Sequence, residues 1–301
     1  MKTLFEATTH APAKINLGLH ITGRREDGYH LLHTLMQTIS LRDTVSLRVF
    51  SCADPVPPIL LTVTGDPTLT DIPLDIRNTV YRIVQRYLER IKRPELKVHV
   101  QVEKRIPSQA GLGGASTDAA AALRLLNTHF SLPHNEILNL AAKIGADVPF
   151  FLYGGTCICE GIGEIVTPVS PLTPYTLLLI KAPVGISTPK AFQRFDERFP
   201  TGSGAETRIH SWDRQSSTLW DETPYLLNDL ACIAIEDHPE IQHCIDFLRD
   251  NGAIHAAMSG SGTCVFGVFP REPDATAAAQ KAKTNFPPDY FIQTATLIPG
   301  E

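Results

Sequence analysis

The sequence contains no apolar run that approaches the roughly 20 residues needed to cross a bilayer. Near its start, Glu6 and His10 lie where a secretory signal peptide needs an apolar stretch. The chain also lacks a basic excess, since its formal net charge is -5, whereas nucleic-acid-binding proteins are usually basic. These absences predict a cytoplasmic protein with no membrane or nucleic-acid partner. Local basic pockets for a small phosphate ligand remain compatible with this charge.

Cysteine is sparse and scattered, so neither a disulfide framework nor a zinc site is indicated. The six cysteines form no CxxC pair and have no zinc-like spacing, and we expect reduced structural thiols at 52, 157, 159, 232, 244 and 264. With 43% hydrophobic and 20% charged residues, the chain is typical of a globular protein with a sizeable core. Its 301 residues suffice for two ordinary domains or one large one.

The first clear element is a strand over 13–21. Ile15, Leu17, Leu19 and Ile21 alternate with polar residues or glycine, as in a half-buried strand. This pattern places Lys14, Asn16 and His20 on the face turned away from the core.

The rest of the chain alternates between helical and strand patterns. Asn78 is a plausible cap for a helix over 78–91, a strand over 96–102 leads into a glycine-rich loop, and a helix follows to about 127. A shorter helix over 135–144 stops at Gly145, the residue type that helix C-termini favour. Three prolines at 168, 171 and 174 mark a candidate domain boundary. Beyond them we predict strands over 175–181 and 290–297, a polar loop over 201–217, a hairpin about 258–263, and helices near 189–199, 225–235, 240–251 and 275–285. These elements indicate the α+β class.

The glycine-rich stretch IPSQAGLGGASTDAAAAL, residues 106–123, is the most informative part of the sequence. A helix N-terminus attracts anions through its free N–H groups, and glycine lets a backbone curve around phosphate oxygens. Ser116 and Thr117 add hydroxyl donors, and Lys104 and Arg105 bring positive charge nearby. The stretch therefore predicts a phosphate-binding loop. A tight strand-to-helix turn without a ligand is the alternative.

The commoner nucleotide loops do not fit this stretch. A Walker loop ends in Gly-Lys-Ser/Thr, and no lysine is present there. The dinucleotide fingerprint needs a third glycine where Ser116 stands. No HRD or DFG triplet supports a protein kinase. A phosphate loop of another kind remains.

Three stretches in the same order resemble the three motifs of the GHMP kinases. They are PAKINLGLHITGRREDGYH (12–30), PSQAGLGGASTDAA (107–120) and MSGSGTCVFGVF (258–269). The resemblance implies an α+β protein with an N-terminal domain over 1–167, a C-terminal domain over 168–301, and the active site in the cleft between them. Across nearly the whole chain, the sequence is most similar to the branch that phosphorylates a cytidine-diphosphate-linked methylerythritol. The stretches 22–45, 144–155 and 225–230 are characteristic of that branch.

The loop departs from the usual family pattern at three positions. Gln109 and Ala110 stand where a glycine-containing pair is common, and Ala115 stands where Gly or Ser is usual. We expect that none of these positions requires a positive φ angle.

The resemblance also implies catalytic roles. Asp147 matches the base that acts on the substrate hydroxyl, and Lys14 matches the partner lysine that keeps this base ionised and offsets charge on the attacking oxygen. From position alone, Asp147 is equally a turn-capping aspartate, and for Lys14 a solvated strand lysine would be the favoured interpretation.

Substrate and nucleotide residues follow in the same way. Tyr29 and Phe192 match the walls of a cytidine pocket, His30 its hydrogen-bonding imidazole, and Asn16 the contact near the reactive end of the substrate. Without the resemblance, the aromatics would be core residues and His30 a polar turn residue. ATP is expected along Lys104, Pro107, Gly111, Leu112, Gly113, Gly114, Ala115, Ser116 and Thr117.

Magnesium is expected with ATP because it neutralises the transferring phosphates. No carboxylate cage is evident, so the protein ligands of the metal stay unknown. Ser116 is one candidate, and Asp118 is equally a first-turn residue favoured by the helix dipole. The implied partner is a small-molecule substrate, and we expect a monomer or weak homodimer.

Three other functions stay open. A GHMP kinase for another alcohol, such as homoserine or mevalonate, would not need Tyr29, His30 and Phe192, because those substrates have no base to stack. A nucleotide-binding regulator would need neither Lys14 nor Asp147. A purely structural domain would leave the phosphate loop and the third motif unexplained.

Overall fold

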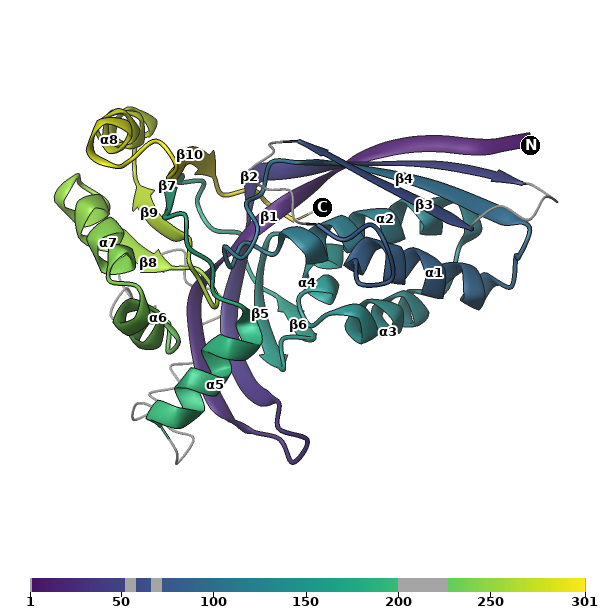
Figure 1. Ribbon diagram of the computed structural model, residues 1–301, viewed down its shortest axis with the longest axis horizontal. Helices are drawn as coiled ribbons and strands as arrows, with labels where there is room; N and C mark the ends of the chain where they lie inside the picture. The colour runs from purple at the N-terminus through teal and green to yellow at the C-terminus, as the bar shows by residue number, and fades with distance from the viewer. Residues whose placement is uncertain (1, 52–57, 66–71, 200–226, 301) are drawn as a thin grey trace. The chain divides into compact units, whose positions relative to one another are not determined.

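The computed structural model describes residues 2–51, 58–65, 72–199 and 227–300, and within them the chain is a mixed α+β protein (Figure 1). The strands are β1 Lys2–Arg24, β2 His30–Ser51, β3 Ile59–Gly65, β4 Leu96–Lys104, β5 Thr156–Gly161, β6 Ile165–Pro168, β7 Thr176–Lys181, β8 His255–Met258, β9 Val265–Phe269 and β10 Phe291–Thr296. The helices are α1 Thr79–Ile91, α2 Gly114–Phe130, α3 His134–Ile144, α4 Val148–Tyr153, α5 Thr188–Arg198, α6 Ala231–Asp237, α7 Glu240–Asp250 and α8 Glu272–Asn285. The predicted fold class is confirmed. No helix in these described ranges is both long and apolar enough to span a membrane.

The chain forms two compact units, each built from separate stretches of sequence. The first unit contains Met1–Ala13, Leu41–Pro107 and Gly113–Tyr153, and the second contains Lys14–Ser40, Ser108–Leu112 and Gly154–Glu301. Strands β1 and β2 therefore contribute residues to both units. The domain boundary expected after residue 167 stays a prediction.

In the first unit, β4 pairs antiparallel with the last part of β2 and parallel with β3. Its alternating Leu96, Val98, Val100 and Val102 are all buried, as the sequence pattern predicts. Helix α1 packs against α2, and the side chain of Asn78 accepts a hydrogen bond from the N–H of Val80 at 2.8 Å, which confirms the predicted cap.

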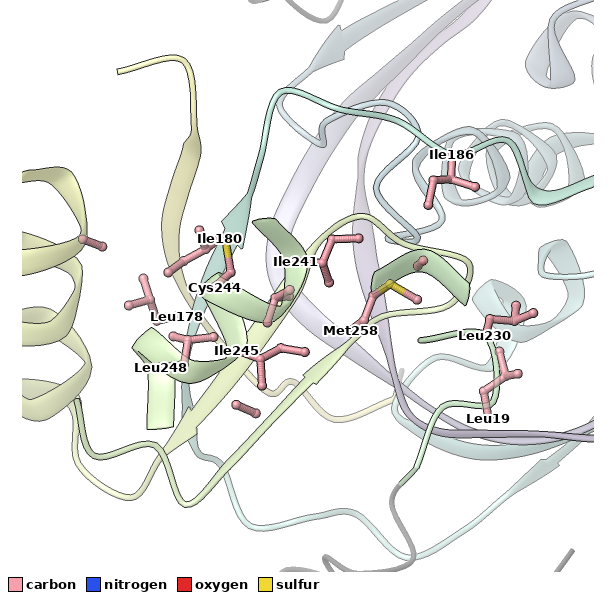
Figure 2. Packing of buried hydrophobic residues seen from close by; sticks show 14 of the residues in the cluster. Leu19, Leu178, Ile180, Ile186, Leu230, Ile241, Cys244, Ile245, Leu248 and Met258 are labelled. Carbon is pink, nitrogen blue, oxygen red and sulfur yellow. The ribbon is translucent and has the colours of Figure 1, made fainter. Parts of the chain in front are cut away.

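In the second unit, a four-stranded antiparallel sheet has the order β10-β7-β9-β8. Helices α7 and α8 pack on this sheet, and β5 pairs with the first part of β2. Figure 2 shows the resulting core, in which Cys244, Ile245 and Leu248 of α7 lie close to Leu178 and Ile180 of β7. The predicted hairpin corresponds to β8 and β9.

Strand β1 departs from its predicted half-buried character. Ile15, Leu17, Leu19 and Ile21 are buried as expected, but Lys14 and Asn16 are buried too, at 3% and 2% exposure. The prediction that their face turns away from the core was wrong. Polar groups from other elements line that face of β1, so its polar side chains are buried against them and do not face solvent.

Smaller differences concern helix ends and cysteines. Gly145 does end α3, but with an extended backbone and not the left-handed cap that favours glycine. Helix α6 starts at Ala231, later than the predicted 225, while 225, 226 and the predicted loop over 201–217 lie outside the described residues. The five described cysteines are free, and Cys52 lies outside the described ranges.

Candidate active site

The glycine loop has a backbone that needs glycine at two positions. Gly113 is the N-cap of α2 with φ 73°, and Gly111 has φ 71°. A Cβ atom on Gly111 would lie 1.9 Å from the carbonyl oxygen of Ser259 in the third motif. The loop therefore approaches another backbone too closely for any side chain, and α2 begins immediately after it.

The expectation that no residue at positions 109, 110 and 115 needs a positive φ was wrong at one of them. Gln109 has a positive φ of 48°, whereas Ala110 and Ala115 do not, as expected. The backbone oxygen of Gln109 accepts from the N–H of Thr263 at 3.3 Å, and its side chain fills the space beside Gly185. These contacts hold a conformation that costs a non-glycine residue roughly 1–2 kcal/mol.

Lys104 does not face the loop as a free cation. Its ammonium donates to Asp118 at 2.7 Å and to Asp43, and all three side chains are buried. Asp43 also accepts from the backbone N–H groups of Arg105 and Ile106 at 2.5 and 2.8 Å. A Cβ on Gly114 would lie 3.2 Å from the Lys104 ammonium, so this cluster supports the first turn of α2.

Burial and the neighbouring charges in this cluster shift the pKa values of Lys104 and Asp118. Burial lowers the pKa of Lys104, but the charges of Asp118 and Asp43 outweigh it, so the pKa of this ammonium is raised. Burial raises the pKa of the Asp118 carboxyl to about 8, against the opposing effect of Lys104. One lysine therefore does not neutralise two buried carboxylates, and Asp118 takes up a proton more readily than an ordinary aspartate.

In the second unit, Lys14 and Asn16 belong to a buried polar network. Lys14 Nζ donates to Asn16 Oδ1 at 2.5 Å, and Asn16 Nδ2 donates to Thr34 Oγ1 at 2.8 Å. The N–H of Asn16 donates to Ser259 Oγ, which itself donates to the carbonyl oxygen of Gly111 at 2.9 Å. The first, second and third motifs therefore meet through Asn16, Gly111 and Ser259. A solvated Lys14 is excluded.

Asp147 lies in the first unit, in the turn between α3 and α4, directly before Val148. It is partly exposed. This position is compatible both with a turn-capping residue and with a catalytic carboxylate, so its role stays a prediction.

The three residues of the predicted cytidine pocket lie in the second unit. Tyr29 is 59% exposed, so core packing does not explain it. The ring of Phe192 stacks on the ring of His30, with centroids 4.7 Å apart and planes at 16°. His30 Nε2 lies 2.7 Å from Asp196 Oδ1. The structure thus brings His30 and Phe192 together but leaves no gap for a base between their rings.

Several polar residues of these clusters were not predicted from the sequence, among them Asp43, Asp196 and Ser259. Asp196 is four residues after Phe192 on α5, a spacing that places both on one helix face. Asp43 lies 61 residues before Lys104, and local patterns contain no sign of this pairing.

No cluster of three or more metal-ligating His, Cys, Asp or Glu side chains occurs among the described residues. Two buried carboxylates near the start of α2, Asp43 and Asp118, are bound to Lys104. A magnesium ion that arrives on nucleotide phosphates and keeps several waters needs no such cluster, so these residues are compatible with it.

The chain matches two known family models and several curated relatives. The family of the GHMP kinases N terminal domain matches residues 78–155, and that of the GHMP kinases C terminal domain matches residues 224–288. A 4-diphosphocytidyl-2-C-methyl-D-erythritol kinase of Caldicellulosiruptor saccharolyticus is 36% identical over 280 residues, which cover 91% of each chain. The enzyme of that name from Clostridium tetani is 35% identical over 287 residues, covering 94% of this chain and 98% of the relative.

Solved structures agree with these matches. A crystal structure of 4-(cytidine 5'-diphospho)-2C-methyl-D-erythritol kinase aligns with a TM-score of 0.68 at 29% identity, covering 96% of this chain and 99% of that one. A mevalonate kinase of L. major in complex with R-mevalonate aligns with a TM-score of 0.75 at 16% identity, over 99% and 97% of the two chains. The second likeness shows a shared fold alone.

Proposed function

This chain belongs to the GHMP kinase family, and from that premise we propose that it phosphorylates the 2-hydroxyl of 4-diphosphocytidyl-2-C-methyl-D-erythritol with ATP, a step in non-mevalonate isoprenoid precursor synthesis. The observation that carries the proposal is the match to enzymes of that name over more than nine-tenths of the chain. Homoserine and mevalonate kinases share the fold at only 17% and 16% identity, which gives no support for those substrates.

The phosphate loop is the part of the chain that we propose for ATP. The N-terminus of α2 offers N–H groups and a partial positive charge to the phosphates. Because Leu112 and Thr117 are buried, they would contribute backbone groups, whereas Ala115 is exposed and Gly113 lets the backbone curve. Lys104 would act through its support of Gly114 and not as a direct phosphate ligand.

We propose Asp147 as the base in the transfer step. The substrate hydroxyl oxygen forms a bond to the γ-phosphorus, and the bond from that phosphorus to the bridging oxygen breaks, so its electron pair leaves with ADP. The hydroxyl proton passes to the Asp147 carboxylate. Lys14 would offset the negative charge on the attacking oxygen, with its ammonium oriented by Asn16. Magnesium bound to ATP would neutralise the phosphate oxygens.

Release of ADP with magnesium ATP tests the substrate assignment. We expect turnover with the cytidylylated methylerythritol and none with homoserine or mevalonate. Turnover with another alcohol would support the assignment of the phosphate loop and contradict the assignment of the cytidine pocket. If ATP binds and all three alcohols stay unreacted, a nucleotide-binding regulator replaces the kinase.

Replacing the two proposed catalytic residues tests their roles. We expect Asp147→Asn and Lys14→Ala each to lower kcat by about 10²–10⁴-fold, the range for loss of a positioned proton acceptor or charge. Circular dichroism and thermal melting check that the fold persists. The matched controls are the exposed Asp250→Asn and Lys143→Ala, which we expect to keep the full rate. A rate near that of the unaltered protein in either test variant removes that residue from the mechanism.

A further inference from the structure

One face of α5 holds the ring of His30 from three directions. Phe192, Phe195 and Asp196 follow the spacing i, i+3 and i+4, so their side chains project from the same face of the helix. Phe192 stacks on the imidazole, and Phe195 meets it edge-on, with centroids 6.3 Å apart and planes at 89°. Asp196 Oδ1 lies 2.7 Å from Nε2. The plane of the ring and the direction of its nitrogens are therefore both fixed.

The carboxylate of Asp196 is itself oriented by Arg24. Its second oxygen lies 3.2 Å from Arg24 Nη1, and Arg24 Nε donates to the carbonyl oxygen of Gly28 at 3.1 Å. Arg24 ends β1, just before the turn that leads to His30. Beside a guanidinium, an aspartate acts as a hydrogen-bond acceptor. The partner offered to His30 Nε2 is thus an acceptor of defined direction.

An acceptor at one imidazole nitrogen decides where the proton of the neutral ring lies. When Nε2–H donates to Asp196, the lone pair of the neutral ring is on Nδ1. Within the part of the chain that the structure describes, the ring makes no hydrogen bond other than that at Nε2. Nδ1 therefore remains available as an acceptor for a ligand.

We infer that Asp196 is a positioning residue that fixes the Nε2–H tautomer of His30, and that Nδ1 thereby selects a pyrimidine with an exocyclic amine. The inference rests on the proposed function, in which His30 contacts the base of the substrate. Cytosine carries an amine at C4, which can donate a hydrogen bond to Nδ1. Uracil carries a carbonyl oxygen there, whose lone pairs would face the lone pair of Nδ1. The pair His30–Asp196 thus determines the preference for cytidine over uridine.

A merely structural Asp196 would behave differently. Its contacts to Arg24 and His30 join α5 to the turn over 25–29, so its loss could loosen that region. Loosening would lower turnover of cytidine- and uridine-linked substrates by the same factor, because it changes no donor or acceptor at the base edge. The ratio of the two rates therefore distinguishes the roles.

Steady-state kinetics of Asp196→Asn with the cytidine-linked and the uridine-linked methylerythritol provide the first test. The Asn side chain offers Nε2 a donor as well as an acceptor, so it no longer imposes the Nε2–H tautomer on the ring. We expect the cytidine preference in kcat/KM to fall at least about tenfold, the size of one specific base-edge hydrogen bond. Asp196→Glu keeps the acceptor and should keep the preference. An equal fall for both substrates overturns the inference.

Asp237→Asn is the matched control. Asp237, at the end of α6, is about as exposed as Asp196, at 32% against 29%. It pairs at 3.0 Å with Arg194 of α5, the helix that carries Asp196, but it contacts no base-pocket residue among those described. We expect it to leave the cytidine preference unchanged.

Nitrogen-15 NMR of the His30 ring in the protein without substrate provides a second test. We expect a protonated Nε2 and an unprotonated Nδ1, with the His30→Gln variant used to assign the signals. A proton on Nδ1 in the unaltered protein overturns the inference. This readout does not depend on turnover. If no cytidine-linked alcohol is phosphorylated but the tautomer is as expected, the proposed function fails while the role of Asp196 in fixing the tautomer stands.

Discussion

Gln109 and Gly111 lie two residues apart, and both have a left-handed backbone, although only one of them is a glycine. The need for glycine at 111 follows from a local rule, because a phosphate loop brings its backbone close to other groups. The conformation of Gln109 depends on Thr263 and Gly185, which are remote in sequence. Residue patterns predicted the first and could not predict the second.

The Gly111→Ala variant would combine two costs, a strained backbone and a crowded Cβ atom. A left-handed alanine costs roughly 1–2 kcal/mol, and forced overpacking adds about 1–3 kcal/mol. Because the new Cβ would meet the oxygen of Ser259, we expect Gly111→Ala to lower the free energy of unfolding by about 2–5 kcal/mol and to weaken ATP binding. Urea denaturation and nucleotide titration measure the two effects.

Gly252→Ala is the control for this substitution. Gly252 also has a positive φ, of 94°, but a Cβ there would have no atom within 4 Å. We expect a loss of only about 1–2 kcal/mol and normal ATP binding. Equal losses in the two variants would show that the close approach to Ser259 is not important.

At the scale of elements, the sequence predicted α1 and β4 well, because their periodic apolar residues form one buried face each. It predicted α2 from the alanines that follow the glycine loop, and this helix is buried at every position from Thr117 to Leu123. The sequence did not predict which groups would contact the polar face of a strand. Asn16 on β1 and Lys104 on β4 are buried against partners from other elements, Ser259 near β8 for Asn16 and Asp43 on β2 for Lys104. Such pairings arise from tertiary packing, and no local spacing contains them.

The cluster at the start of α2 predicts a pH dependence of stability. Between pH 3.8, the ordinary pKa of an aspartate, and the raised pKa of about 8, folded Asp118 holds a proton that the unfolded chain has released. The free energy of unfolding should therefore fall as the pH rises through this window, by at most about 1.4 kcal/mol per pH unit. Asp118→Asn should remove this slope.

Urea denaturation at several values between pH 5 and pH 8 measures the slope in both proteins. Histidines titrate in the same range, but they are common to both, so the difference isolates Asp118. The exposed Glu89→Gln, in the same unit, is the control and should keep the slope of the unaltered protein. An identical slope in Asp118→Asn would mean that Asp118 is ionised in the folded state.

At the scale of the whole molecule, the family was predictable because three motifs occur in a fixed order, and the matches to kinases confirm it. The assignment of Lys14 and Asp147 to one chemical step was not derivable from local chemistry. The two residues lie 133 positions apart in sequence and belong to different compact units. Only the resemblance links them, so their cooperation needs a functional test.

A double-mutant cycle provides that test. If Lys14 and Asp147 act on the same step, the loss of either removes most of what the pair contributes, and the second substitution adds little. We therefore expect kcat of Lys14→Ala/Asp147→Asn to be within about tenfold of the slower single variant, well above the product of the two separate losses. Single-turnover measurement of the phosphoryl-transfer rate gives the comparison without product release. Multiplicative losses would assign the two residues to independent roles and leave Asp147 as a base without help from Lys14.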